Sequence, residues 1–204
     1  MDQTVKKSRV SFRHKYNMPS KSKIKGSGYE RDVAKFLSEQ YNEPFVRVPN
    51  SGAYVGGINN HRKKFLDNNQ TKSFKGDIIA PDTWLKFNCE CKSYKDFPFH
   101  LLLTGKCAQL DSWLDQLLDV EDEGDMNILF MKFNRIGQYV AVQPKLTWVM
   151  DNYTFYASKD YGDWIVTEKD SFFNNNQHLV KLYSSKTDTK SDNSDNTHLA
   201  LQTP

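Results

Sequence analysis

The 204-residue sequence contains too few cysteines for a disulfide framework and no apolar run long enough for a membrane span. It has three cysteines, and the pair Cys89 and Cys91 lacks the spacing of a structural zinc site. No run of about 18 apolar residues occurs, so we expect no transmembrane helix. The N-terminus shows no apolar run followed by small residues, so no secretory signal is expected. Together these absences predict an intracellular protein in a reducing compartment.

The remaining composition is that of a single folded domain with polar ends. Apolar residues make up 38% of the chain, including 13 Phe and 10 Tyr, which suffices for a packed core. We expect a flexible basic arm, a core, an accessory extension packed on that core, and a disordered tail. These segments are assigned to residues 1–25, 26–145, 146–183 and 184–204.

The net charge of +3 conceals an uneven distribution of charge along the chain. Residues 1–95 carry 19 Lys or Arg and 9 Asp or Glu, a net charge of +10. Residues 96–204 carry 9 and 16, a net charge of −7. A basic half suits a polyanionic partner such as nucleic acid. Charge that varies without any functional reason is the alternative, and charge alone does not decide between the two.

Hydrophobic periodicity predicts alternating helices and strands. Val33, Ala34, Leu37 and Tyr41 recur at helical spacing, which indicates a helix that starts near Ser27 and ends near Tyr41. Further elements are a strand at 45–48, a hairpin of 77–80 and 84–92 around a turn at 81–83, a helix at 104–118, and strands at 128–133 and 138–143. This order predicts an α/β fold in which helices pack on a mixed sheet. The pattern does not set the topology of residues 146–183.

The hairpin would bring three distant side chains to one face. If its turn is centred between Thr83 and Trp84, Asp77 lies directly across from Glu90, with Cβ atoms roughly 5 Å apart. Lys92 follows Glu90 by two residues and therefore shares its face. The opposite face would be apolar and suited to the core, since it would show Ile78, Ala80, Phe87, Cys89 and Cys91.

Two carboxylates and an ammonium in this arrangement suit the metal-dependent hydrolysis of a phosphodiester. The carboxylates can hold a divalent cation, and the ammonium can steady developing negative charge. The backbone carbonyl of Cys91 could serve as a further metal ligand. A surface Glu–Lys pair with a nearby Asp is the alternative. Asp82 is excluded from the site, because an extended strand would separate it from Glu90 by about 26 Å.

Glu30 has two possible roles. Ser27 and Glu30 fit a capping box at the start of the first helix, in which Glu30 folds back to the Ser27 amide. Glu30 also lies on the apolar stripe of that helix, where a carboxylate is costly without a partner. A metal shared with Asp77 and Glu90 would supply that partner. From the residues alone the capping role is favoured, and the two roles are compatible.

The long polar segment 50–75 is a candidate for contact with DNA. Its basic residues are interleaved with Tyr54, Phe65 and Phe74, which suits phosphates and nucleobases together. A solvated loop without such a role is the alternative. We expect basic residues of this segment and of the N-terminal basic arm to bind DNA. They are Lys23, Lys25, Arg62, Lys63, Lys64, Lys72 and Lys75.

Several motifs follow one another in an order that is typical of a known family. They are the segments Lys25–Arg31, Val46–Gly52, Asp77–Ala80 and Glu90–Lys92, with Gln109 opening a later helix. This ordered set covers about residues 25–143 and resembles the archaeal-type Holliday junction resolvases of the restriction-endonuclease-like, or PD-(D/E)xK, nuclease superfamily. The resemblance implies a mixed central sheet flanked by helices, to which the C-terminal segment would be an accessory.

The resemblance also implies a site, a cofactor and partners. Glu30, Asp77 and Glu90 would form the acidic metal site, Lys92 would be the catalytic lysine, and Ser51 would lie beside the scissile phosphate. Arg47 and Gln109 join the residues expected to contact DNA. The metal would be Mg²⁺, with Mn²⁺ able to substitute, and no nucleotide cofactor or membrane is expected. A homodimer is implied because a four-way junction is resolved by two symmetric cuts.

Three features depart from the family. Gly76 replaces the usual proline before the aspartate, the segment 53–75 is long, and residues 146–204 have no recognised counterpart. The last feature suits a phage-like version acting in the cytoplasm of a prokaryotic or phage-infected cell. The sequence therefore predicts a structure-selective hydrolase for DNA recombination and repair that cuts four-way junctions. The alternatives are a nuclease of the same chemistry acting on flaps, forks or host duplex DNA, and an inactive DNA-binding module.

Overall fold

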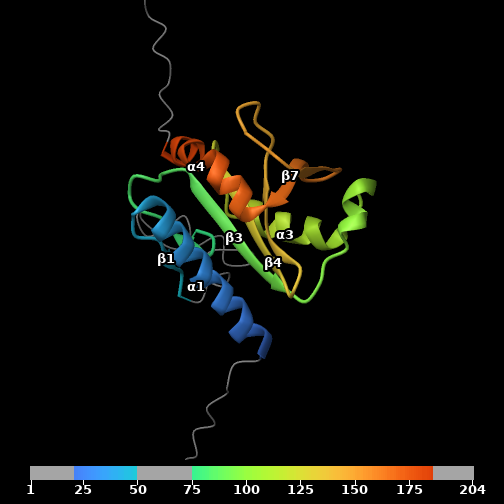
Figure 1. Cartoon of the computed structure of the whole chain (residues 1–204), viewed down its shortest axis with the longest axis horizontal. Helices are drawn as coiled ribbons and strands as arrows, with labels where there is room; N and C mark the ends of the chain where they lie inside the picture. The colour runs from blue at the N-terminus through green and yellow to red at the C-terminus, as the bar shows by residue number, and fades with distance from the viewer. Residues whose placement is uncertain (1–20, 50–74, 186–204) are drawn as a thin grey trace, which may run out of the picture.

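The computed structural model describes residues 21–49 and 75–185, with side chains from residue 26 onward (Figure 1). Within these ranges, no helix is both long and apolar enough to cross a bilayer. The elements in chain order are α1 (Lys21–Tyr41), β1 (Val46–Arg47), β2 (Ile78–Ile79), β3 (Phe87–Tyr94), the 3₁₀-helix η2 (Phe99–Thr104), α3 (Ala108–Leu118), β4 (Met126–Phe133), β5 (Gly137–Val142), β6 (Tyr153–Ser158), β7 (Gly162–Glu168) and α4 (Lys169–Ser185).

A five-stranded mixed sheet organises the fold, with strand order β3-β4-β5-β7-β6. Strands β3 and β4 are parallel, and the other neighbouring pairs are antiparallel. The helix α3 lies in the connection between the two parallel strands, as such a crossover requires. The predicted α/β class is therefore confirmed, and β3 forms one edge of the sheet.

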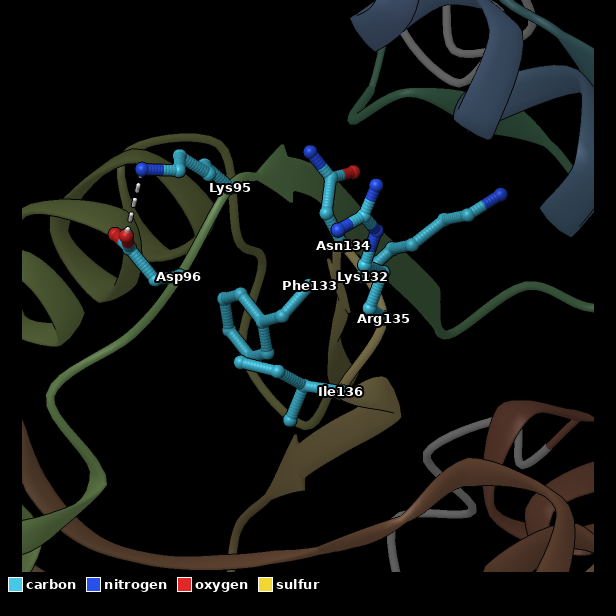
Figure 2. Close-up of a pocket in the computed structure, with 7 residues that line it drawn as sticks. All are labelled: Lys95, Asp96, Lys132, Phe133, Asn134, Arg135 and Ile136. Carbon is cyan, nitrogen blue, oxygen red and sulfur yellow. Dashed lines mark ion pairs between the residues drawn. The ribbon is translucent and has the colours of Figure 1, made fainter.

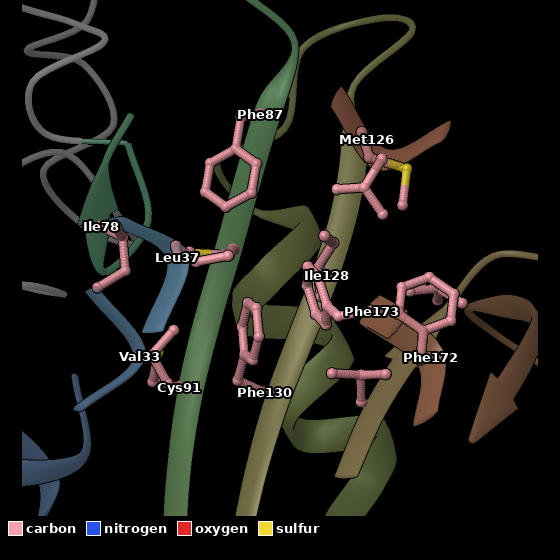
Figure 3. Close-up of a cluster of buried hydrophobic side chains, with 14 of the residues drawn as sticks. Val33, Leu37, Ile78, Phe87, Cys91, Met126, Ile128, Phe130, Phe172 and Phe173 are labelled. Carbon is pink, nitrogen blue, oxygen red and sulfur yellow. The ribbon is translucent and has the colours of Figure 1, made fainter. Parts of the chain in front are cut away.

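Alternating side chains on the strands separate two hydrophobic clusters. One face of β3 and β4 contributes Cys89, Cys91, Ile128 and Phe130 to a cluster completed by residues of α1 and α4. Figure 3 shows Val33 and Leu37 from α1, and Phe172 and Phe173 from α4, gathered around this face. The other face contributes Leu129, Met131 and Phe133, which pack with the buried face of α3 that the sequence predicted: Leu110, Trp113, Leu114 and Leu117.

The first helix starts earlier than its periodicity indicated. Helix α1 begins at Lys21, so Ser27 lies inside the helix. An N-cap residue has a non-helical backbone and precedes the first turn. The capping box predicted for Ser27 and Glu30 is therefore wrong, and Glu30 needs another explanation.

The hairpin predicted from residues 77–92 is also corrected. Strand β2 pairs with β1, with Val46 opposite Ile79, and both form a small antiparallel sheet. The turn itself exists, because the Trp84 amide donates to the Pro81 carbonyl at 2.9 Å. Strand β3 takes β4 as its ladder partner instead. Hydrogen bonds from Val48 to Asp77 and from Asp77 to Cys89 still bring the small sheet against β3.

The segment 146–183 shares the sheet and the core of the preceding residues. Strand β7 inserts between β5 and β6, so the central sheet is completed by residues 153–168. Phe172 and Phe173 of α4 are buried in the same cluster as α1. The fold thus forms one unit around the sheet, with α1 and α4 on one face and α3 on the other.

Candidate active site

Strand β3 presents a carboxylate and an ammonium on the same face. The Lys92 Nζ lies 2.6 Å from Oε1 of Glu90, and the two side chains are only 12% and 15% exposed. Cys89 and Cys91 point to the opposite face and are buried in the core. The predicted parity of β3, with chemistry on one face and core on the other, is confirmed.

Asp77 lies against the same segment of β3. Its amide donates to the Cys89 carbonyl at 3.0 Å, and its Oδ2 accepts a hydrogen bond from the Cys91 amide at 2.8 Å. Asp77 is 4% exposed. Asp77 therefore contacts the backbone on both sides of Glu90, through its amide at Cys89 and its carboxylate at Cys91, where the sequence had predicted direct cross-strand opposition. Asp77 reaches the backbone beside Glu90 through this edge contact and not through a hairpin ladder.

Glu30 approaches from α1 and is paired with a cation. Its Oε2 accepts a hydrogen bond from Nε of Arg47 on β1. Glu30 is almost fully buried. A buried carboxylate on an apolar stripe requires a partner, and Arg47 is that partner. Glu30 also lies near enough to Glu90 for its charge to act on that carboxyl.

The titration of Glu90 reflects this crowding of negative charge. Burial raises the pKa of the Glu90 carboxyl, and the charge of Glu30 raises it further, while Lys92 opposes both effects. Burial also raises the pKa of the Cys89 and Cys91 thiols, and the charges of Asp77 and Glu90 add to it. Both thiols are buried in the core, where they serve as packing groups.

A divalent metal fits the chemistry of these side chains. Asp77 and Glu90 supply the carboxylate oxygens that Mg²⁺ prefers, and the raised pKa of Glu90 marks a negative charge that a cation would stabilise. In residues 21–49 and 75–185, no three Asp, Glu, His or Cys side chains converge as a ready-made metal cluster. Asp77 is thus held against the backbone that flanks Glu90, whereas the third carboxylate, Glu30, is engaged by Arg47.

Some of the residues expected to bind DNA are placed by the structure. Arg47 remains partly exposed beside Glu30, and Gln109 is half-buried in the first turn of α3. Lys75 requires a correction, because it is buried and pairs with Asp125 and, at 2.7 Å, with Asp122. Its ammonium is therefore not available to DNA. Outside the described residues or side chains lie Lys23, Lys25, Ser51, Arg62, Lys63, Lys64 and Lys72.

One neighbour of the site carried no signal in the sequence. Gln116 of α3 accepts a hydrogen bond from the Lys92 Nζ through its Oε1. An exposed glutamine on a helix belongs to no motif, and only the packing of α3 beside β3 reveals it. Gln116 lies two helical turns beyond Gln109, so helical spacing could have placed both on one side of α3.

A mixed sheet flanked by helices, with Asp77 against the Glu90–Lys92 segment, has the arrangement of a restriction-endonuclease-like nuclease. Residues 21–190 match the family model described as phage putative PDDEXK endonuclease. The chain belongs to this family and is thus an endonuclease of the PD-(D/E)xK superfamily with a restriction-endonuclease-like fold. Neither the curated proteins nor the solved structures gave a match.

Proposed function

We propose that the chain is a Mg²⁺-dependent endodeoxyribonuclease that cuts branched DNA, above all four-way junctions. The observation that carries the proposal is the packing of Asp77 against β3 at the position where β3 presents Glu90 and Lys92. Membership of the family supports endonuclease chemistry. The ordered motifs over residues 25–143, which resemble the archaeal-type junction resolvases, support the choice of substrate.

The metal would be held by Asp77 and Glu90, with the Cys91 carbonyl and Glu30 as further ligands. The Cys91 amide faces Asp77, and in an extended strand the carbonyl of a residue points to the same side as its amide. Glu30 would join by exchanging its partner Arg47, which then becomes free to contact a phosphate. When bound, Mg²⁺ would polarise a phosphoryl oxygen and lower the pKa of a coordinated water, and Mn²⁺ is expected to substitute.

Lys92 would be the catalytic lysine. Its Nζ is already held between Glu90 and Gln116, so it needs little reorganisation to donate to the reacting phosphate. An ammonium that is fixed before the reaction stabilises the developing negative charge more effectively than a mobile one. Ser51 is proposed to lie beside the scissile phosphate. Flanking DNA would be held by Arg47, Gln109, Lys23, Lys25, Arg62, Lys63, Lys64 and Lys72.

The direct test is cleavage of an end-labelled four-way junction in the presence of Mg²⁺. Asp77→Asn, Glu90→Gln and Lys92→Ala should each abolish cutting, because each removes a metal ligand or the catalytic ammonium. Binding of the junction, measured by fluorescence anisotropy, should remain. Lys159→Gln is the matched control, since Lys159 is exposed in the turn between β6 and β7 at the far edge of the sheet. A wild-type cleavage rate in any of the three variants would contradict the proposal.

Metal binding can be separated from catalysis by calorimetry. Mg²⁺ or Mn²⁺ should bind the wild-type chain, whereas the Asp77→Asn variant should bind the metal far more weakly. If the chain were an inactive DNA-binding module, it would bind DNA, and the two proteins would not differ in metal affinity. The intact set of Asp77, Glu90 and Lys92 argues against that alternative, and Asp77 packs against the strand that carries the other two.

The substrate and the assembly need their own measurements. A nuclease of the same chemistry acting on flaps, forks or host duplex DNA would share all active-site residues, and membership of a phage family is compatible with it. Cleavage rates on junction, flap, fork and plain duplex at equal salt distinguish these substrates. Light scattering on the junction complex tests the proposed homodimer, which two symmetric cuts require.

A further inference from the structure

A hollow at the end of β3 has no role in the site described above. It encloses about 780 Å³ where the segment after β3 meets the turn between β4 and β5. Figure 2 shows Asn134 and Arg135 of this turn between Lys95 on one side and Lys132 on the other. The remaining lining residues are Asp96, Phe133 and Ile136.

The charge of this hollow is mainly positive and weakly neutralised. The lining contains three cations, Lys95, Lys132 and Arg135, and a single carboxylate, Asp96. Lys95 and Asp96 lie 3.8 Å apart with 86% and 76% of their side chains exposed, and such surface pairs contribute little. The Lys132 Nζ lies 3.2 Å from Oδ2 of Asp32 on α1, in a pair whose side chains are 39% and 62% exposed. The cations can therefore exchange these partners for an anion.

The turn holds Arg135 in a backbone conformation that favours other residues. The Ile136 amide donates to the Phe133 carbonyl at 3.2 Å, and Arg135 occupies the third position of this turn with φ of 60°. Glycine or asparagine is preferred there. The Asn134 amide donates to the Tyr94 and Lys95 carbonyls, which anchors the turn to the end of β3. An arginine kept in an unfavourable conformation at a cationic hollow points to a function for its side chain.

The hollow lies close to the candidate active site along the chain. Lys95 directly follows the end of β3 and is three residues beyond Lys92, a separation of at most about 10 Å. A phosphate in the hollow would thus lie within a few nucleotides of the bond that faces Glu90 and Lys92. Tyr94, half exposed between them, offers a ring on which a base can stack.

We infer that the hollow lined by Lys95, Lys132, Asn134 and Arg135 binds the DNA backbone beside the scissile bond. Its ligands are phosphate groups of the substrate, held by the three cations and the Asn134 side chain. This inference rests on the proposed function, because it takes DNA to be the substrate. It adds a subsite that fixes where along the strand the active site cuts.

The double variant Arg135→Asn/Lys95→Gln tests the inference with little risk to folding, since asparagine suits the conformation of residue 135. We expect its melting temperature to equal or exceed that of the wild type. The readout is anisotropy of a labelled junction in EDTA over a series of salt concentrations. The magnitude of the slope of log affinity against log salt concentration should decrease by roughly 2. The affinity for the junction at low salt should decrease about tenfold. Lys159→Gln should leave the slope within about 1 of the wild type.

The cleavage rate separates this inference from the proposed function. At saturating protein and Mg²⁺, the double variant should still cut the junction, because Asp77, Glu90 and Lys92 are unchanged. A wild-type chain that cuts DNA while the double variant keeps the wild-type slope would overturn the hollow as a subsite and leave the nuclease intact. A wild-type chain that neither binds nor cuts DNA would overturn both.

Discussion

The backbone conformation of Gly76 explains why the chain departs from the usual proline before the aspartate of the motif. Its φ is +63°, whereas the proline ring fixes φ near −65°. A Cβ at this position would lie 2.3 Å from the Cys89 carbonyl oxygen, the atom that accepts the Asp77 amide. The glycine thus permits the close approach that sets Asp77 against β3, and the departure is a structural requirement of this chain.

Replacement of Gly76 should therefore damage both stability and activity. We expect Gly76→Ala to lower the free energy of unfolding by more than the roughly 1–2 kcal/mol that a left-handed alanine costs, because the clash with Cys89 adds to it. Gly76→Pro, which restores the common motif, should be worse. Gly162→Ala is the matched control, since Gly162 has φ of +74° with open space around it. Equal losses in urea unfolding for the two alanine variants would refute this role of Gly76.

The buried charge of Glu90 should reduce the stability of the folded chain at neutral pH. Because its folded-state pKa is raised, the stability that its proton supplies is complete below the ordinary carboxyl pKa and is lost as the pH rises through the raised value. Glu90→Gln imitates the protonated form. It should melt higher than the wild type at pH 8, by roughly 2–4 °C for each kcal/mol gained, and the difference should vanish toward pH 4.

Thermal unfolding across this pH range checks the sign of the effect. Glu39→Gln is a suitable control, because Glu39 is exposed on α1 and pairs only loosely with Lys35 at 3.6 Å. It should show no comparable gain at pH 8. A lower melting temperature for Glu90→Gln at pH 8 would mean that the attraction of Lys92 outweighs the burial of the Glu90 charge.

At the scale of elements, the sequence predicts the position and buried face of helices and strands well, but it predicts poorly which strands pair with each other. The apolar face of α3, the strands β4 and β5, and the parity of β3 follow from periodicity alone. The hairpin was wrong because periodicity does not say which strand a strand pairs with. The parallel pairing of β3 with β4 spans a crossover through α3, and such long-range contacts leave no local signal.

The same distinction applies to the active site. Asp77, Glu90 and Lys92 could be predicted as site residues because their spacing suits metal-dependent chemistry, and the structure packs Asp77 against the strand that carries Glu90 and Lys92. The hydrogen-bond and ion-pair partners of Glu30, Lys75 and Lys92 could not be predicted from the sequence. Arg47, Asp125 and Gln116 are distant in sequence and reach them only through packing of separate elements.

The ion pair of Lys75 with Asp125 ties the residue before Gly76 to the loop before β4. The Asp125 side chain is 0% exposed, and burial raises its pKa despite the attraction of Lys75. Lys75→Met would leave this carboxylate without its cation, which costs roughly 3–5 kcal/mol for a buried pair. The loss in urea unfolding should be largest at pH 8 and should shrink as the pH falls and Asp125 takes up a proton.

A second substitution separates this effect from a general disturbance of the loop. Lys75→Met/Asp125→Asn removes the buried charge together with its partner, so it should recover much of the lost stability at pH 8. Lys86→Met is a control at a partly exposed lysine that donates to a backbone carbonyl. A double variant as unstable as Lys75→Met alone would show that the ion pair is not the cause.

At the scale of the whole molecule, the last third of the described chain is part of the nuclease fold. Strand β7 lies in the interior of the sheet, and α4 packs into the same hydrophobic cluster as α1. A chain ending at residue 145 would expose the edge of β5 and the apolar surface beneath Phe172 and Phe173. We expect it to lack a cooperative thermal transition and any nuclease activity, as measured by circular dichroism and junction cleavage.

A chain ending at Ser185 provides the comparison for this truncation. It keeps every contact described for β6, β7 and α4, so its melting temperature should match that of the full-length chain. Cooperative unfolding of the chain ending at residue 145 would show that residues 146–183 are dispensable for the core, as an accessory extension would be.

The place of β7 within the sheet has a consequence for synthesis on the ribosome. The sheet cannot acquire its final strand order, nor the core its closing helix, until residues beyond 180 have left the exit tunnel. Glu90 and Lys92 are translated long before that moment, yet the surface that supports them is incomplete. A message cut short or a stalled ribosome would thus release no partially active DNA-cutting enzyme, only a fragment that cellular proteases can remove.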